Sequence, residues 1–248
     1  INTHVYLRNK FFIKKLINLL YYFSIKNLFL IFLNKDDYYF FNKNIATKKN
    51  NYKIFNSEGV DINYYLNYSC KNIQNKNFSF LMASRIIADK GVNEYLKAAH
   101  EVKKNNPNVI FYLAGEFDSS RNAIKKNIID EYVNNKTIVF LGYKNDIREI
   151  ICNSSCIVLP SYREATGMIL VEAALMKKPL LATNVPGCRN VVIDNYNGFL
   201  VQKGDHKDLA EKMKNMIILK QKKIEVFSSN SRKHASINFD VNNIIKEF

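Results

Sequence analysis

Two glutamates in the second half of the chain, Glu164 and Glu172, are candidates for a paired carboxylate site. They follow an apolar run at 156–159 that predicts a buried strand, and the apolar residues around Glu172 repeat at helical intervals. Glu172 lies eight positions after Glu164, a little over two helical turns, so both carboxylates can flank one crevice at the carboxyl edge of that strand. Such a pair suits the hydroxyls of a sugar and the diol of a ribose. The alternative also stays open: Glu164 complements a helix N-terminus, and Glu172 is an exposed helix acid.

The residues between the two glutamates predict a seat for phosphate. A helix that begins near Thr166 would point its N–H groups and the positive end of its dipole into the same crevice, where an anion is favoured. Gly167 carries no side chain, so a phosphate or a sugar can approach the backbone there. The candidate binding residues of this segment are Ala165, Thr166, Gly167 and Met168.

Two cations, Arg85 and Lys90, lie where an expected strand at 78–83 meets the next helix. At the ligand edge of a parallel sheet, two such cations can neutralise the charge of a bound phosphate group. Tyr143 lies in a loop at the same edge, where its ring can pack on a base. Each has an ordinary alternative: surface charge for the two cations, and a plain surface or core tyrosine for Tyr143.

The elements that must position these residues alternate along the chain. Short apolar runs predict five strands, at 78–83, 109–114, 137–141, 156–159 and 179–183, with helical spacing between them. Strand and helix in repeated alternation predict an α/β fold with a Rossmann-like, doubly wound parallel sheet. A basic amphipathic helix is expected at 207–223 and a short helix at 241–248.

The region before residue 78 predicts part of a second Rossmann-like domain. It contains an expected strand at 28–34, a short helix at 36–42 and another strand at 53–56, followed by a polar, glycine-bearing turn. We place a domain boundary at this turn. The expected organisation is a remnant domain at 1–56, a linker at 57–77, a ligand-binding domain at 78–230 and a helical segment at 231–248.

The charge of the chain favours an anionic partner. Its 248 residues carry a formal net charge of +15, and the first fifty hold nine Lys or Arg against two acids. Nucleic acid, an anionic membrane surface and phosphorylated small molecules all suit such a surface. The sequence matches no RNA- or DNA-binding motif, so we do not expect a nucleic-acid partner.

The apolar stretch 11–33 is interrupted by Lys14, Lys15 and Lys26, which disfavours a membrane span. We expect a buried or domain-packing helix followed by a strand, with a helix that also touches an anionic bilayer surface as the open alternative. No signal-peptide pattern is present, so the expected location is the cytoplasm, with the inner face of the membrane as the alternative.

The four cysteines form neither a CxxC pair nor a set with His at ligand spacing. This pattern disfavours zinc and a disulfide framework. We therefore expect small core residues at Cys70, Cys152, Cys156 and Cys188.

These motifs resemble those of the family 4 retaining glycosyltransferases, or group 1 glycosyltransferases, which have the GT-B fold. Glu164 and Glu172 resemble the family's Glu-x7-Glu motif, and the segment 182–189 resembles the stretch that follows it. Arg85 and Lys90 resemble its phosphate-binding Arg and Lys. The similarity extends over about 55–220 and includes the segments 57–61, 113–116 and 141–143. The nearest branch extends lipid-linked, capsule or O-antigen oligosaccharides.

The resemblance implies that residues 78–230 bind a nucleoside-diphosphate sugar, with UDP as the expected nucleotide. It implies transfer of the sugar, with retention at the anomeric carbon, to a saccharide or lipid-linked acceptor, without a metal or another cofactor. The implied catalytic residues are Glu164, Arg85 and Lys90, and the implied donor contacts are Glu172, Arg85, Lys90, Ala165, Thr166, Gly167, Met168 and Tyr143. The alternative is a truncated, inactive module that binds a nucleotide-sugar.

The chain departs from the family in its amino-terminal part. Most of the acceptor-binding domain has no counterpart, including its glycine-rich loop, so we expect an amino-terminally truncated chain. His4 stands near the place where many members carry a functionally important His. The alternative is that this lone His at a chain end has no functional role.

Overall fold

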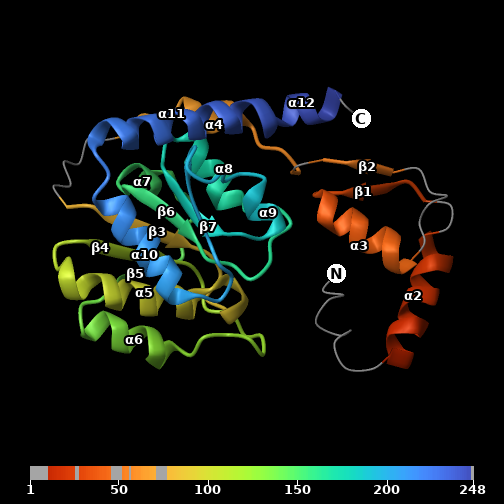
Figure 1. Ribbon diagram of the computed structural model, residues 1–248, viewed down its shortest axis with the longest axis horizontal. Helices are drawn as coiled ribbons and strands as arrows, with labels where there is room; N and C mark the ends of the chain where they lie inside the picture. The colour runs from red at the N-terminus through yellow and green to blue at the C-terminus, as the bar shows by residue number, and fades with distance from the viewer. Residues whose placement is uncertain (1–10, 26–27, 46–51, 56, 71–76, 247–248) are drawn as a thin grey trace. The chain divides into compact units, whose positions relative to one another are not determined.

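The computed structural model describes residues 11–25, 28–45, 52–55, 57–70 and 77–246. The chain divides into two compact units, Ile1–Ser57 and Glu58–Phe248. Each unit has its own parallel sheet (Figure 1).

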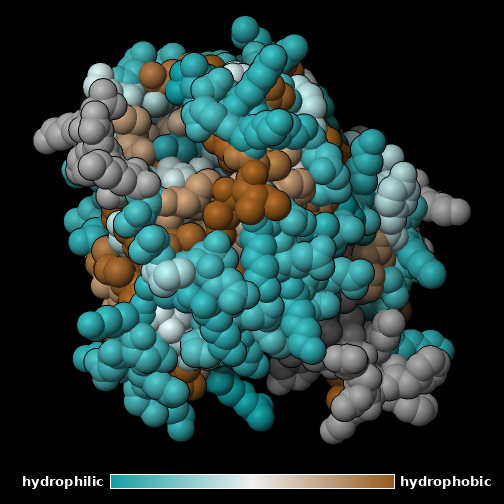
Figure 2. Space-filling model, turned by 60° about the vertical axis from the view of Figure 1, so that its left-hand side comes forward, coloured by the Kyte–Doolittle hydropathy of each residue, from teal (hydrophilic) through white to brown (hydrophobic). Residues whose placement is uncertain are grey.

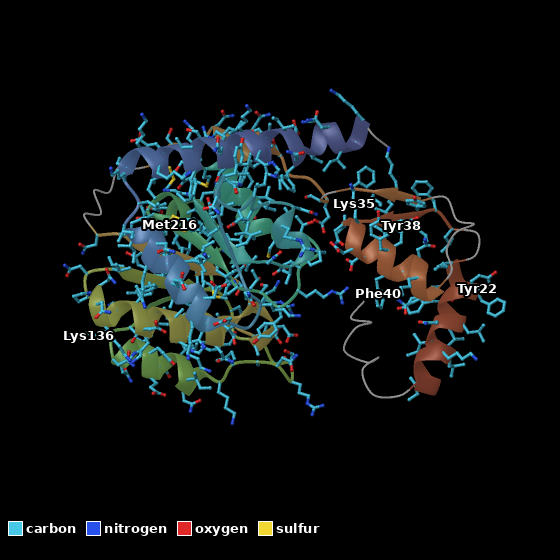
Figure 3. The ribbon with its side chains drawn as sticks, in the orientation of Figure 1. Tyr22, Lys35, Tyr38, Phe40, Lys136 and Met216 are labelled. Atoms are coloured by element: carbon cyan, nitrogen blue, oxygen red, sulfur yellow. A yellow bond between two sulfur atoms is a disulfide. The ribbon has the colours of Figure 1, made fainter. Side chains whose placement is uncertain are left out.

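The first unit contains two helices and two short strands: α2 (Phe11–Ile25), β1 (Leu30–Phe32), α3 (Lys35–Ile45) and β2 (Tyr52–Ile54). The strands are parallel, and Ile31 is paired with Lys53. The ring of Tyr38 on α3 stacks on Tyr52 with the ring centroids 4.3 Å apart (Figure 3 labels Tyr38). This pattern confirms part of a second Rossmann-like domain.

The apolar stretch 11–33 forms α2 and β1 in the expected order, a helix followed by a strand. The described side chains of α2 are half-buried or exposed, so the prediction of a buried helix was wrong. Within the described residues, no helix combines the length and the apolar character that a membrane crossing requires. Several large apolar side chains of this stretch are exposed, among them Leu16, Leu20 and Phe23. The expected contact with an anionic membrane surface stays a prediction.

The second unit is built on six parallel strands: β3 (Ser79–Ala83), β4 (Ile110–Ala114), β5 (Val139–Gly142), β6 (Cys156–Leu159), β7 (Leu180–Thr183) and β8 (Gly198–Val201). Their order in the sheet is β5-β4-β3-β6-β7-β8. Five of these strands were predicted, with ends that differ by at most two residues from the structure. The sequence pattern missed β8, which begins with a glycine, a residue that is depleted in strands.

Helices cover both faces of this sheet (Figure 1). One apolar cluster joins the sheet to α5 (Val92–Asn105), α6 (Lys126–Asn134) and α10 (His206–Ile217), and Met216 of α10 is fully buried in it (Figure 3). The other joins the sheet to α4 (Ile62–Leu66), α7 (Arg148–Cys152), α8 (Met168–Leu175) and α9 (Pro186–Arg189). The expected doubly wound α/β fold is confirmed. The outer surface seen in Figure 2 is mostly hydrophilic.

The helix expected at 207–223 is two helices, and the prediction of one was wrong. The helix α10 ends at Ile217, and α11 (Gln221–Asn238) begins after an extended Lys220. The helix α11 then runs from the cluster that contains α10, where its Phe227 is buried, to the cluster on the other face of the sheet, where its Ala235 is buried. Position 230, where we expected a boundary, lies inside α11, and α12 (Val241–Lys246) follows.

The prediction for two of the four cysteines was also wrong. Cys70, in the segment after α4, forms a disulfide with Cys152 at the end of α7, across 82 positions of sequence. The spacing could not show this pair, because the two segments meet only when α4 and α7 pack in the same layer. Cys156 and Cys188 are free and buried, as expected.

Candidate active site

The strand order reverses between β3 and β6, and this reversal determines where a ligand can bind. In an open parallel sheet, the loops that leave two such strands diverge, and a crevice opens beyond their carboxyl ends. Arg85 follows β3, and Glu164 lies in the loop that follows β6. Arg85 and Glu164, which are far apart along the chain, therefore lie at the same edge of the sheet.

A tight backbone contact brings Lys90 to the loop after β6. Lys90 ends a single 3₁₀ turn, Ala88–Lys90, and Gly91 then takes a left-handed conformation with φ of 77°. A Cβ atom at Gly91 would lie 2.0 Å from the carbonyl oxygen of Pro160, so only glycine fits. The backbone N–H of Tyr162 also donates to the Asp89 carbonyl at 2.8 Å.

Lys90 and Glu164 form an ion pair in this crevice, with Nζ 2.6 Å from Oε1. Their side chains are 23% and 9% exposed, so the pair is largely shielded from water. The hydroxyl of Ser161 donates to the same carboxylate oxygen at 2.7 Å. The hydroxyl of Thr183, at the end of β7, donates in turn to the Ser161 carbonyl. Glu164 is thus held in one orientation by its neighbours.

The loop after Glu164 leads directly into α8. Gly167 is the N-cap of this helix and has no side chain that could cover the first N–H groups. A second glycine, Gly187 of α9, packs so closely that a Cβ atom there would lie 2.6 Å from the carbonyl oxygens of Glu164 and Ala165. Ala165 is exposed, Thr166 is buried and Met168 is half-buried. This segment therefore brings a helix N-terminus to the sheet edge, as the predicted phosphate-binding site requires.

Arg85 lies on the surface of the same edge, with a side chain that is 65% exposed. Its guanidinium contacts the carboxylate of Asp118 at 3.1 Å. Hydrogen bonds from Ser120, and then the Arg85 guanidinium, hold the pKa of Asp118 below its usual value. Because the arginine is so exposed, its side chain can turn toward an anionic ligand at small cost.

A cavity of about 240 Å³ opens at the carboxyl ends of β3, β4 and β5. Arg85 and Tyr143 both line it, together with Glu116 and Lys144. Ile147 and Ile169 supply apolar contacts. The combination of apolar walls with a few polar groups is typical of a pocket for a small molecule.

Glu172 has different surroundings from Glu164. It lies half-buried on α8, where Tyr65 from α4 is close enough to influence the pKa of its carboxyl group. Burial raises the pKa of Glu172; the nearby carboxylate of Asp146 raises it further, and the Tyr65 hydroxyl lowers it. Burial, followed by Glu172, raises the pKa of Tyr65 as well.

The structure therefore brings the sequence-predicted residues to one sheet edge in three groups: Arg85 with Tyr143 in the cavity, Lys90 with Glu164, and Glu172 on its own on α8. Sequence reasoning missed Tyr65 and Ser161. Only the position of Ser161, three residues before Glu164, gave a signal. His4 lies outside the described residues. Among the described residues, no three or more His, Cys, Asp or Glu side chains gather as metal ligands would, and binding without a metal stays a prediction.

Curated relatives share this region of the chain. The chain is 29% identical over 143 residues to the capsular polysaccharide biosynthesis glycosyltransferase CapM of Staphylococcus aureus. This alignment covers 58% of the chain and 37% of the relative. It is 26% identical over 248 aligned residues to the N,N'-diacetylbacillosaminyl-diphospho-undecaprenol alpha-1,3-N-acetylgalactosaminyltransferase of Campylobacter jejuni, with 95% of the chain and 63% of the relative covered. The chain thus spans less than two thirds of either relative.

Solved structures share the fold. A glycosyltransferase from Rickettsia africae superposes with a TM-score of 0.77 at 20% identity, over 88% of this chain and 60% of that one. The Anabaena protein HepE in complex with UDP superposes with a TM-score of 0.73 at 23% identity, over 88% of this chain and 61% of that one. These likenesses confirm the expected GT-B type of fold.

The family itself follows from the sequence match. The profile of the family described as Glycosyl transferases group 1 matches residues 70–234, which is more than half of the chain and includes every strand of the six-stranded sheet. With the strand order and the sheet-edge residues already described, this match shows that the chain belongs to the group 1 glycosyltransferases.

Proposed function

We propose that this chain binds a nucleoside-diphosphate sugar, with UDP as the nucleotide, at the point where its strand order reverses. The observation that carries the proposal is the gathering of three kinds of group at one sheet edge. A cavity contains Arg85 and Tyr143, a shielded pair joins Lys90 to Glu164, and the N-terminus of α8 lies in the same loop. These groups suit a base, a diphosphate and sugar hydroxyls.

Each part of the donor has a matching group. The base enters the cavity between Tyr143 and the apolar side chains of Ile147 and Ile169. The diphosphate lies toward Arg85, Lys90 and the positive end of α8. The ammonium group of Lys90 has three N–H donors, and its contact with Glu164 uses one, so the others can reach phosphate oxygens.

Glu164 supplies the carboxylate that faces the sugar. Its Oε1 atom accepts from both Lys90 and Ser161, which fixes the plane of the group. The other carboxylate oxygen then has lone pairs for the hydroxyls of a donor sugar. Glu172 is the acceptor for the ribose diol in this arrangement.

We propose that the reaction is transfer of the sugar, with retention, to a saccharide or lipid-linked acceptor. The acceptor oxygen forms a bond to the anomeric carbon, the bond from that carbon to the diphosphate oxygen breaks, and the electron pair leaves with the diphosphate. The acceptor proton passes to the leaving phosphate. Arg85, Lys90 and the N-terminus of α8 stabilise the charge that develops there. The names of the Staphylococcus and Campylobacter relatives, in capsule and lipid-diphosphate sugar transfer, support this acceptor class.

Calorimetric titration with UDP and UDP-N-acetylhexosamine in EDTA tests the donor site. Arg85→Ala and Lys90→Ala should each weaken UDP about 10-fold to 100-fold, as expected for a hydrogen bond to a charged group. Lys97→Ala is the matched control, because Lys97 is an exposed lysine on α5. Its UDP affinity should equal that of the wild type.

The outcomes separate the hypotheses. A folded wild-type chain that binds neither ligand contradicts the proposed donor site, and so does equal binding by the Arg85 and Lys90 variants. Donor binding without transfer to any saccharide or lipid-linked acceptor would instead favour the inactive nucleotide-sugar-binding module.

A further inference from the structure

A disulfide joins the segment after α4 to the end of α7. Cys70 and Cys152 form it, and their Cα atoms are 5.6 Å apart. Cys70 is exposed, whereas Cys152 is half-buried. A thiol from solution can therefore reach the sulfur of Cys70 more easily than that of Cys152. Exposed disulfides of this kind are the ones that exchange readily with small thiols.

Other contacts keep the two cysteines close without the bond between their sulfur atoms. The Arg148 guanidinium of α7 lies 4.6 Å from the ring centroid of Tyr68, two positions before Cys70. The ring of Tyr68 also packs on the apolar cluster that contains α8. At the other end of α7, the ammonium group of Lys178 donates to the Cys152 carbonyl at 2.6 Å. Because these contacts do not depend on the disulfide, the two thiols stay close enough after reduction to form the bond again.

The other two cysteines differ from this pair. Cys156 and Cys188 are free, and both are fully buried. Burial raises the pKa of each thiol, so little of the reactive thiolate forms near neutral pH. Both should be inert toward thiol reagents while the chain is folded. They serve as internal references for any measurement on Cys70 and Cys152.

The disulfide closes a long loop of the chain. Cys70 and Cys152 are separated by 82 positions of sequence. The loop between them contains β3, β4 and β5, and the cavity of about 240 Å³ opens at the carboxyl ends of these strands. A crosslink restricts the unfolded chain more strongly when the loop that it closes is longer. The bond should therefore stabilise the part of the fold that contains the cavity.

We propose that Cys70 and Cys152 form a thiol–disulfide exchange site, which reacts at Cys70 with a low-molecular-weight thiol such as glutathione. The small thiolate attacks the sulfur of Cys70, the bond to Cys152 breaks, and the electron pair leaves on the Cys152 sulfur, which takes a proton from water. A second small thiolate attacks the mixed disulfide, which releases Cys70 as a thiol together with a small-molecule disulfide. Oxidised glutathione drives the reverse reaction. The redox state of the pair thus sets the stability of the second unit, independently of the proposed function.

Thiol labelling of the folded chain tests the site. The chain equilibrated with oxidised glutathione should label at no cysteine, whereas after reduced glutathione, peptide mapping should find label at Cys70 and Cys152. Among single variants, Cys152→Ser should form a mixed disulfide with oxidised glutathione at least about 10-fold faster than Cys70→Ser, because its remaining thiol of the pair is the exposed one. Cys156→Ala is the matched control, and it should label as the wild type does.

Thermal unfolding gives a second readout. The reduced chain should melt about 5–15 °C below the oxidised chain, because the crosslink of a long loop is lost. A double variant with Cys70→Ser and Cys152→Ser should melt at one temperature in oxidised and in reduced glutathione.

Three results would overturn the inference. The first is labelling of Cys70 in the folded chain after equilibration with oxidised glutathione. The second is equal rates of mixed-disulfide formation in the two single variants. The third is a melting temperature of the wild type that does not change with the redox state of glutathione. None of these measurements uses UDP, so their failure leaves the proposed donor site standing.

Discussion

The ion pair between Lys90 and Glu164 allows the strongest prediction about stability. Lys90→Met keeps most of the aliphatic stem and removes the charge. Glu164 would then keep a carboxylate that is 9% exposed, with the Ser161 hydroxyl still donating to it at 2.7 Å. The same change removes a cation from the proposed diphosphate site. The variant should therefore be less stable and should also bind UDP more weakly.

The size of the effect follows from the burial of the pair. An exposed pair contributes about 0–1 kcal/mol, whereas removing one partner of a buried pair costs about 3–5 kcal/mol. With side chains 23% and 9% exposed, this pair lies between the two cases. We expect Lys90→Met to lower the free energy of unfolding by about 2 kcal/mol. Glu164→Gln, which keeps an acceptor for Ser161, should cost about 1 kcal/mol.

Urea unfolding of the wild type, both single variants and the double variant forms a double-mutant cycle. The loss in the double variant should be smaller than the sum of the two single losses by about 1 kcal/mol or more. Additive losses, or a loss below about 0.5 kcal/mol for Lys90→Met, would refute the argument that the pair is shielded and coupled. UDP affinity measured on the same proteins separates the structural effect from the binding effect.

Three further changes test other parts of the account. Gly91→Ala should lower the free energy of unfolding, measured by urea titration, by about 3 kcal/mol or more. The backbone φ at Gly91 is 77°, and the new Cβ would clash with the Pro160 carbonyl. A loss below about 1 kcal/mol would contradict this. Tyr95→Phe should cost about 1–3 kcal/mol, since its buried hydroxyl shares its one hydrogen between two backbone carbonyls, and an unchanged unfolding midpoint would show that this interaction contributes nothing. Burial lowers the pKa of Lys178 to about 8, so its buried charge destabilises the fold below pH 8 and this cost disappears as pH rises toward 10.5. The stability of the wild type relative to Lys178→Met should therefore rise across that window, and a flat difference would be the contrary result.

The sequence predicted the elements of the second unit well where burial is complete. The residues of β6 are all buried, and a strand covered on both faces must be continuously apolar, so its ends were found at Cys156 and Leu159. The edge strand β8 was missed, because Gly198 is required by close contact with the Leu180 backbone rather than by any strand pattern. The break between α10 and α11 was also missed, because the apolar spacing alone does not show the turn between two helices whose adjoining ends pack on the same cluster.

For the candidate site, the sequence placed residues at an edge but not in contact with one another. Arg85 and Lys90 were predicted to act together, whereas the structure pairs Lys90 with Glu164 and turns Arg85 toward Asp118. The proximity of Tyr65 to Glu172 depends on the packing of α4 on α8. Long-range contacts of this kind leave no pattern in a single sequence.

Amide chemical shifts of the folded chain titrated with UDP show whether the donor nucleotide binds where the strand order reverses. The largest changes should fall on residues 84–85, 115–116, 143–144 and 167–169, with α6 and α10 unaffected. Changes centred on α6 or α10, or saturable UDP binding that leaves those four segments unshifted, would contradict it.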